Sequence, residues 1–201
     1  DILLVEDGFL LSIKGQAELH ADQLVIACGG FPKLSQFEWL QNLGHSIVSP
    51  VPSLFSFNIP RHPITELMGL SVPNAKVKVN GTKLQQSGPL LITHWGLSGP
   101  AILKLSAYGA LELAEKEYKF QLHVNFLAEH NEDTLRGSFT EYKQQHPTQK
   151  LSNIQGFPIP KRLWDLLLFL SQIDEEQRWL DLPAKQMNKL LKSVTALELN
   201  V

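Results

Sequence analysis

The sequence predicts a mixed α+β protein, built around a β-barrel-like sheet with an inserted cluster of helices. Two observations support this class. Short segments in which apolar and polar residues alternate recur along the chain, as half-buried strands require. Three segments near the C-terminus instead place apolar residues at helical spacing. With 201 residues, 43% of them hydrophobic and 19% charged, the chain is long enough for one ordinary domain core and a small second unit.

The first fifty residues are expected to form strands and one short helix. Residues 2–30 alternate around Asp7-Gly8, which indicates a hairpin, and a strongly apolar strand is predicted over residues 23–27. Over residues 35–43 the apolar side chains fall at helical spacing. Gly44 follows them as a cap at the C-terminus of the predicted helix.

A run of prolines marks the boundary between two parts of the chain. Four of them follow one another closely, at positions 50, 52, 60 and 63. Such a density is typical of linkers, and it predicts a boundary near residues 49–54. We therefore expect a first domain of residues 1–49 and a second of residues 50–201.

The second part is predicted to contain both strands and helices. Strands are expected at residues 54–59 and 75–79, and Asn80-Gly81 is a good hairpin signal before residues 83–85. Residues 117–126 alternate cleanly, so one face of a half-buried strand carries Tyr118, Phe120, Leu122, Val124 and Phe126. Helices are predicted at residues 132–145, 160–172 and 184–193, and a last strand at residues 195–201.

One segment combines a strand, a tight turn and the start of a helix. The apolar residues 90–92 suit a buried strand, and the turn after them contains His94, Trp95 and two glycines. Ser98 is expected to cap the helix, and Pro100 falls in the first turn, where its missing N–H is not needed. Such residues suit a turn for conformational reasons alone, while free N–H groups at a helix start also attract polar ligand atoms. Both interpretations stay open.

This segment resembles a motif of the YhiN-like family of predicted FAD-dependent oxidoreductases, which is also called BaiN-like or aminoacetone-oxidase-like. The motif is T-H-x-G-x-S-G-P-A-x-L, and it is matched by Thr93, His94, Gly96, Ser98, Gly99, Pro100, Ala101 and Leu103. Residues 24–30 resemble the family's strand that ends in an A-T-G-G-like turn, with Cys28 where threonine is usual. Residues 43–54 resemble its L-G-H-x-I-x-x-P-x-P-x-L connection, and the three motifs occur in the family's order.

The resemblance implies that residues 1–49 are a partial piece of a Rossmann-like FAD-binding domain. Residues 50–201 are then the inserted domain that covers the flavin and lines the substrate cleft. No G-x-G-x-x-G fingerprint occurs in residues 1–201. We therefore expect a middle fragment of a flavoprotein that does not hold FAD alone, is inactive alone, and has the remaining FAD-binding segments of its parent as partners.

The resemblance also implies roles for two parts of the chain. The Gly29-Gly30 turn is expected to bind FAD, because glycine lets the backbone approach a ligand closely. Cys28 is interpreted as a small buried apolar residue rather than an active thiol. His94 is the candidate catalytic residue, since a turn beside two glycines can present its imidazole to a cleft. A hydrogen-bonded structural histidine is the alternative interpretation.

The residues expected to line the substrate or flavin cleft are Thr93, His94, Trp95, Gly96, Ser98 and Gly99. Thr93 and Ser98 are interpreted as turn and capping residues rather than catalysts. Residues 96–100 are comparable with the G-x-S-x-G nucleophile elbow, but Pro100 replaces the last glycine, so acyl transfer is not favoured. The histidines are scattered and the single cysteine lacks a C-x-x-C partner, so no metal site is predicted.

Charge and hydropathy argue against other classes of partner. Lys and Arg total 18 against 20 Asp and Glu, without a basic stripe, so we expect a small-molecule substrate and no nucleic acid. The longest strongly apolar stretch, residues 163–170, is far shorter than the roughly 20 residues that cross a bilayer, so no membrane partner is expected. One cysteine fits a reducing compartment, which favours the cytoplasm. A non-catalytic ligand- or protein-binding module is the alternative function.

Overall fold

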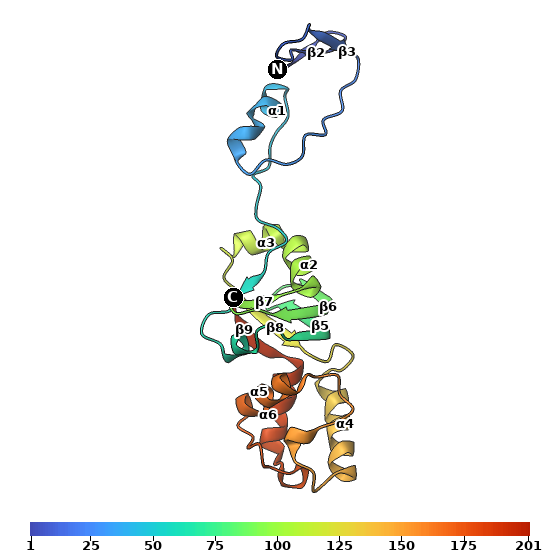
Figure 1. Ribbon diagram of the computed structural model, residues 1–201, viewed down its shortest axis with the longest axis vertical. Helices are drawn as coiled ribbons and strands as arrows, with labels where there is room; N and C mark the ends of the chain where they lie inside the picture. The colour runs from blue at the N-terminus through green and yellow to red at the C-terminus, as the bar shows by residue number, and fades with distance from the viewer. The chain divides into compact units, whose positions relative to one another are not determined.

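The computed structural model describes residues 1–201, and the chain divides into two compact units, Asp1–Val51 and Pro52–Val201 (Figure 1). Unit 1 begins with an antiparallel sheet of three strands in the order β1-β2-β3. These strands are β1 (Ile2–Val5), β2 (Gly8–Leu11) and β3 (Leu19–Ala21). Val5 pairs with Gly8 across the first turn, which confirms the hairpin predicted around Asp7-Gly8.

A short helical segment follows in unit 1. It consists of the 3-10 helix η1 (Leu34–Phe37) and α1 (Glu38–Asn42), and Gly44 follows at a φ of 91°, as the capping prediction requires. The strand predicted over residues 23–27 is wrong, because these residues pair with no other strand and Val25 is 89% exposed. An apolar run becomes a strand only beside a neighbour that exchanges backbone hydrogen bonds with it, and unit 1 provides none at this position.

Unit 1 contains no buried side chain. Every residue of Asp1–Val51 is at least partly exposed, including Leu4 at 66% and Val48 at 82%. Cys28 is also exposed, so its interpretation as a buried apolar residue is wrong. Apolar residues line an open groove of about 920 Å³, among them Leu24, Phe31 and Trp39. The apolar side chains of unit 1 therefore gain little from the hydrophobic effect within this chain.

Unit 2 is built around one antiparallel sheet of six strands in the order β4-β7-β6-β5-β8-β9. Its strands are β4 (Phe57–Asn58), β5 (Ser71–Val79), β6 (Gln85–Ile92), β7 (Gly96–Ser98), β8 (Gln121–Asn125) and β9 (Leu197–Asn200). The sheet curls as a half-barrel, and its edge strands β4 and β9 do not pair with each other. The turn predicted at Asn80-Gly81 joins β5 to β6, which confirms that hairpin.

Alternation along the strands separates the core from the solvent. Val77, Leu122 and Val124 are fully buried, whereas Lys78 on β5 and Glu198 on β9 are exposed. Strand β8 begins at Gln121 rather than at residue 117, as was predicted, because residues 116–118 form the turn that follows the preceding helix. The predicted apolar face nevertheless points inward, since Tyr118 and Phe120 pack against the same core as the buried members of that face.

Helices cover this sheet and form a separate cluster beyond it (Figure 1). Helix α2 (Pro100–Tyr108) packs on β5, β6 and β7, and Gly109 separates it from α3 (Ala110–Glu115), which the sequence did not predict. The cluster contains α4 (Glu132–Gln145), η3 (Leu151–Asn153), α5 (Lys161–Leu170), η4 (Trp179–Asp181) and α6 (Ala184–Thr195). Helix α6 contacts β8 and β9. The α+β class, the barrel-like sheet and the three helices predicted in the cluster are thus confirmed. No helix is both long enough and apolar enough to cross a membrane.

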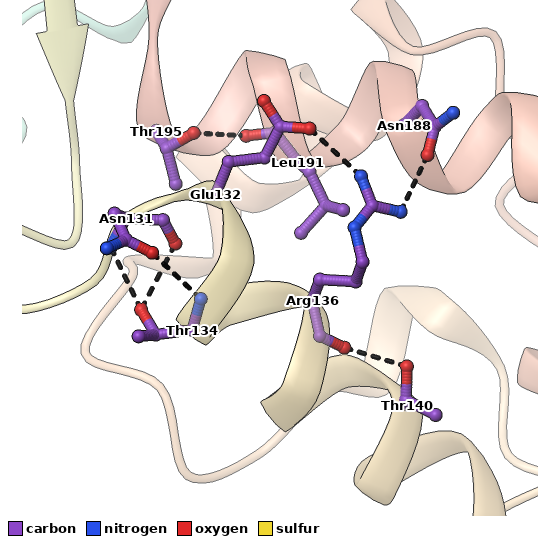
Figure 2. A network of polar contacts seen from close by, with 8 residues as sticks. All are labelled: Asn131, Glu132, Thr134, Arg136, Thr140, Asn188, Leu191 and Thr195. Atoms are coloured by element: carbon purple, nitrogen blue, oxygen red, sulfur yellow. Dashed lines mark hydrogen bonds and ion pairs between the residues drawn. The ribbon is translucent and has the colours of Figure 1, made fainter.

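Side-chain hydrogen bonds close the N-terminus of α4 and tie it to α6 (Figure 2). The side-chain oxygen of Asn131 accepts from the Thr134 amide at 2.8 Å, and the Thr134 hydroxyl accepts from the Asn131 amide at 3.0 Å. This reciprocal pair satisfies two amides that the helix itself leaves free. Arg136 donates to Glu132 at 2.9 Å and to Asn188 on α6 at 2.7 Å. The guanidinium group therefore links the two helices.

Replacing the capping side chain is expected to destabilise unit 2 measurably. Asn131→Ala removes the acceptor for the Thr134 amide and should lower the free energy of unfolding by about 1 kcal/mol. Asn131→Ser supplies another capping acceptor and should retain most of that stability. Urea unfolding followed by far-ultraviolet circular dichroism makes the comparison. Equal midpoints for the alanine and serine variants would show that the cap contributes nothing.

A histidine caps a second helical segment, η2 (Pro63–Leu67). The Nδ1 atom of His62 accepts a hydrogen bond from the Ile64 amide at 3.1 Å. The segment packs against β6 and α5, and Arg162 donates to the carbonyl oxygen of Glu66 at 3.1 Å. Burial lowers the pKa of His62 below its ordinary value. The fold therefore favours the neutral imidazole, which is also the form that can accept this bond.

The His62 cap should make stability depend on pH in the mildly acidic range. Since the folded pKa lies below the unfolded value of about 6.5, the unfolded chain binds the proton more readily. The contribution of His62 is thus present above that pH and is lost as the pH falls through the folded pKa. His62→Asn keeps a capping acceptor that does not titrate. Urea midpoints at several pH values should fall less steeply with acidification in this variant than in the parent.

Candidate functional site

The segment that contains His94 is a tight hairpin turn between β6 and β7. The Thr93 amide donates to the Gly96 carbonyl oxygen at 2.8 Å, and the Gly96 amide donates back to the Thr93 carbonyl oxygen at 3.3 Å. The Thr93 hydroxyl also accepts from the Gly96 amide at 3.1 Å. His94 and Trp95 are therefore the two residues at the tip, and the interpretation of Thr93 as a turn residue is confirmed.

Both side chains at the tip are accessible to a ligand. The rings of His94 and Trp95 pack edge to face, with centroids 4.2 Å apart and planes at 77°. Trp95 is 46% exposed and His94 is exposed as well. Apart from its ring contact with Trp95, neither ring nitrogen of His94 makes a hydrogen bond within the chain, and the catalytic role of His94 stays a prediction.

Strand β4 holds this turn in place from the neighbouring position in the sheet. The Ile59 amide donates to the Trp95 carbonyl oxygen at 2.8 Å, and Asn58 pairs with Gly96. The two backbones approach so closely that a Cβ atom at Gly96 would lie 2.2 Å from the Phe57 carbonyl oxygen. The φ of 157° at Gly96 also disfavours a side chain. Only glycine allows β4 to pack at this distance.

The start of α2 depends on a second close approach. Gly99, at a φ of 90°, is the N-cap residue, and a Cβ atom there would lie 2.9 Å from the Leu91 amide nitrogen and from the Pro89 carbonyl oxygen. The prediction that Ser98 caps the helix is therefore wrong, because Ser98 still pairs with Leu91 as part of β7. Its hydroxyl instead accepts from the Ser56 hydroxyl at 2.7 Å. Pro100 occupies the first helical position, as predicted.

The residues predicted to bind the cofactor lie in the other unit and have different surroundings. Gly29 has a φ of 76°, and no atom lies within 4 Å of the Cβ position at Gly29 or at Gly30. The chain's own packing thus does not require glycine at these positions, in contrast to Gly96 and Gly99. Open space beside an exposed glycine backbone is compatible with the close approach of a ligand.

In the structure, residues 93–99 pack beside β4. The sequence did not predict this contact. Ser56 and Asn58 contact the segment although they precede it by about forty positions in the sequence. The sequence signal was the short apolar stretch at residues 54–59, which predicted a strand but not its neighbour. No group of three or more His, Cys, Asp or Glu side chains is placed to hold a metal ion.

Comparison with known proteins gives one family and several curated relatives. Residues 51–201 match the family described as HI0933-like protein barrel and H2TH domain. A ribosomal RNA dihydrouridine synthase of Escherichia coli is 31% identical over 192 residues, which cover 91% of this chain and 43% of that protein. A 3-dehydro-bile acid delta(4,6)-reductase of Clostridium scindens is 26% identical over 195 residues, with 92% and 47% covered. A ribosomal RNA dihydrouridine synthase of Haemophilus influenzae is 26% identical over 176 residues, with 84% and 41% covered. The chain spans less than half the length of these relatives.

A side chain at Gly96 should destabilise unit 2 strongly. Gly96→Ala brings a Cβ atom into the β4 backbone at an unfavourable φ, which should cost roughly 2–4 kcal/mol of folding free energy. Gly81→Ala is the matched control, since Gly81 also has a positive φ, 73°, but open space around it. That control should cost only about 1 kcal/mol. Urea unfolding of both variants measures the difference, and equal losses would refute the argument from close approach.

Proposed function

The chain belongs to the HI0933-like barrel and H2TH family, which lies within the FAD-dependent oxidoreductases of the YhiN-like or BaiN-like group, and from this premise we propose its function. We infer that it is part of an FAD-dependent oxidoreductase. In that enzyme, unit 2 is the inserted domain that covers the flavin, and it lines the substrate cleft with Thr93, His94, Trp95, Gly96, Ser98 and Gly99. The remaining FAD-binding segments of the longer protein are its partners. The observation that carries this proposal is the exposed His94 and Trp95 tip on a turn held by two backbone contacts.

The state of unit 1 supports a role within a longer protein. It has no buried side chain, and its groove of about 920 Å³ is lined largely by apolar residues. Relatives more than twice as long as the matched segment supply further chain to cover such a surface. A partial piece of a Rossmann-like FAD-binding domain would expose apolar surface in this way, because the parallel strands of such a domain are normally buried on both faces. Strands β1–β3 are antiparallel and are not part of such a parallel sheet.

The names of the relatives suggest the class of reaction. Dihydrouridine is uridine with the carbon–carbon double bond of its ring saturated, and a delta(4,6)-reductase acts on carbon–carbon double bonds in a ring. Both reactions add two hydrogens to an alkene conjugated with a carbonyl group. We therefore propose that this protein contributes to the reduction of a conjugated double bond in a ring. The two hydrogens arrive as a hydride and a proton.

The residues present fit a bound flavin at the Gly29-Gly30 turn. Gly29 and Gly30 leave open space beside an exposed backbone, so they are the residues of this chain that would contact FAD. Reduced FAD, when bound, supplies the hydride. His94 is proposed to donate the proton to the substrate atom that becomes negatively charged, because imidazole exchanges protons readily near neutral pH. Trp95 is proposed to position the substrate ring, since an indole offers a flat apolar face.

Two alternatives are favoured by particular observations. Two of the relatives are named for ribosomal RNA, which favours a uracil base within RNA as the substrate. The near balance of 18 basic and 20 acidic residues favours a small molecule instead. The chain would be a non-catalytic ligand- or protein-binding module if the turn at residues 93–99 were only structural.

The visible absorbance spectrum separates the flavoenzyme from the binding module. The complete product of the gene, purified beside the 201-residue chain and mixed with FAD, should retain a yellow flavin spectrum after gel filtration. The 201-residue chain should not, because it lacks a dinucleotide fingerprint. If neither protein retains flavin, the oxidoreductase proposal fails and the binding-module alternative is favoured.

The role of His94 is tested in the complete, flavin-loaded protein. His94→Gln should lower the rate of substrate reduction by about 10²–10⁴-fold, as expected for the loss of a general acid, without loss of bound flavin. His20→Gln is the matched control, because His20 is also exposed but lies on β3 of unit 1. Unchanged turnover in His94→Gln would assign the proton transfer to another group.

A further inference from the structure

A second candidate binding site lies in unit 2, beside β4. A pocket of about 450 Å³ opens in unit 2 between residues 52–60, residues 117–119 and Val201. Its walls come from β4 with the residues around it, from residues 117–119 that precede β8, and from Val201 that follows β9. Ligand sites of 300–1,000 Å³ are common in proteins, so the pocket is large enough for a small ring system.

The walls of this pocket are aromatic. The rings of Phe55 and Tyr118 meet edge to face with centroids 5.7 Å apart. The ring centroid of Phe57 lies 5.9 Å from that of Phe55 and 5.1 Å from that of Phe120. Phe57 is fully buried, whereas Phe55 and Tyr118 are only partly buried. Two flat apolar side chains at the pocket are thus still open to a partner.

Most polar side chains around these walls have no hydrogen-bond partner within the chain. The side chains of Asn58, Glu117 and Lys119 line the pocket and make no hydrogen bond or ion pair within the chain. The Tyr118 hydroxyl also makes none. Ser56 differs, because its hydroxyl is already bonded to Ser98. The pocket therefore combines apolar walls with several polar groups that can select a ligand by its edge.

Backbone strain is concentrated at the same place. Four of the chain's five non-glycine residues with positive φ line the pocket or directly adjoin its lining, namely Leu54 at 55°, Arg61 at 61°, Glu117 at 52° and Tyr118 at 58°. The fifth, Gln172, lies in the helical cluster. Such conformations are unfavourable for residues with a side chain, and they gather at functional sites when the surrounding structure enforces them. Hydrogen bonds enforce two of them here, from the Glu117 amide to the Ala114 carbonyl oxygen and from the Tyr118 amide to the Leu113 carbonyl oxygen, both at 2.9 Å.

We propose that this aromatic pocket binds a planar conjugated ring that carries hydrogen-bonding groups on its edge. Because the planes of Phe55 and Tyr118 stand at 79° to each other, such a ring stacks on the face of one of them and meets the other edge to face. Asn58 and the Tyr118 hydroxyl bond to carbonyl or N–H groups on its edge. A saturated ring is not flat and gains less from stacking. None of residues 93–99 lines the pocket, although Ser56 and Asn58 contact both, and the proposal does not require the turn to be catalytic.

Two flat rings of different size serve as probes in solution. The ¹⁵N-labelled 201-residue chain is titrated with lumiflavin, a three-ring probe, and with 1-methyluracil, a single-ring probe. Saturable amide shifts should appear at residues 54–61 and 117–119. 5,6-Dihydrouracil, the non-planar control, should bind at least several-fold more weakly than 1-methyluracil. Tighter binding of lumiflavin would indicate a cofactor ring as the natural ligand, and tighter binding of 1-methyluracil a substrate ring.

Substitutions of residues that line the pocket test whether the probes bind there. Tyr118→Ala should weaken the binding of the better probe by roughly five-fold or more, as expected for the loss of one stacking partner. Tyr108→Ala is the matched control, because Tyr108 is a tyrosine of unit 2 that is 77% exposed on α2. Asn58→Ala changes an exposed side chain and tests the polar edge even if the tyrosine variant is unstable.

Four results would overturn the proposal. Shifts that do not saturate, or that fall only in unit 1, would show non-specific binding to its exposed apolar surface. Equal affinity in Tyr118→Ala, Asn58→Ala and the parent would place the probe elsewhere. Shifts of the pocket amides with protein concentration alone would show that a second copy of the chain occupies the pocket. Equal affinity for the flat and the saturated ring would remove the role of stacking.

Discussion

The close approach of β4 to β7 is the contact on which the arrangement of unit 2 around the motif depends. Strand β4 is only two residues long, and it reaches its neighbour because Gly96 has no side chain to separate them. The same strand end anchors the turn through the Ile59 amide and the Trp95 carbonyl oxygen. It also carries Ser56 to Ser98 and brings Phe57 to the aromatic pocket. One backbone contact thus sets the position of both candidate sites.

Backbone geometry, rather than side-chain chemistry, explains most of the motif from Thr93 to Pro100. Gly96 and Gly99 are needed because neighbouring backbones occupy the space of a side chain, and Thr93 and Ser98 bond to groups of the chain itself. The exceptions are the two residues at the tip, His94 and Trp95, which make few contacts with the chain and are exposed. A scaffold that fixes the turn and leaves its tip free is the usual arrangement for a residue that meets a ligand.

The two units differ in how far they bury their apolar side chains. Unit 2 has a continuous core that extends from Phe57 at the edge of the sheet to Trp164 and Trp179 in the helical cluster. Unit 1 has apolar strands and an apolar groove but no buried side chain. The hydrophobic effect stabilises only buried apolar surface, so the apolar side chains of unit 1 gain little stability within this chain. The strand predicted at residues 23–27 illustrates the point, since its composition suits a sheet but it has no neighbour.

Patterns between residues close together in the chain were sufficient to predict much of the local structure. The helices of the cluster, the hairpins at Asp7-Gly8 and Asn80-Gly81 and the inward face of β8 all follow from spacing and turn residues that lie close together in the chain. Three contacts could be seen only once the chain was folded: β4 lies beside β7, Ser98 bonds to Ser56 rather than capping α2, and Phe55 meets Tyr118. These contacts join residues about forty or more positions apart. Local periodicity cannot specify such pairs, because they depend on how the curled sheet brings its strands and its two open edges together.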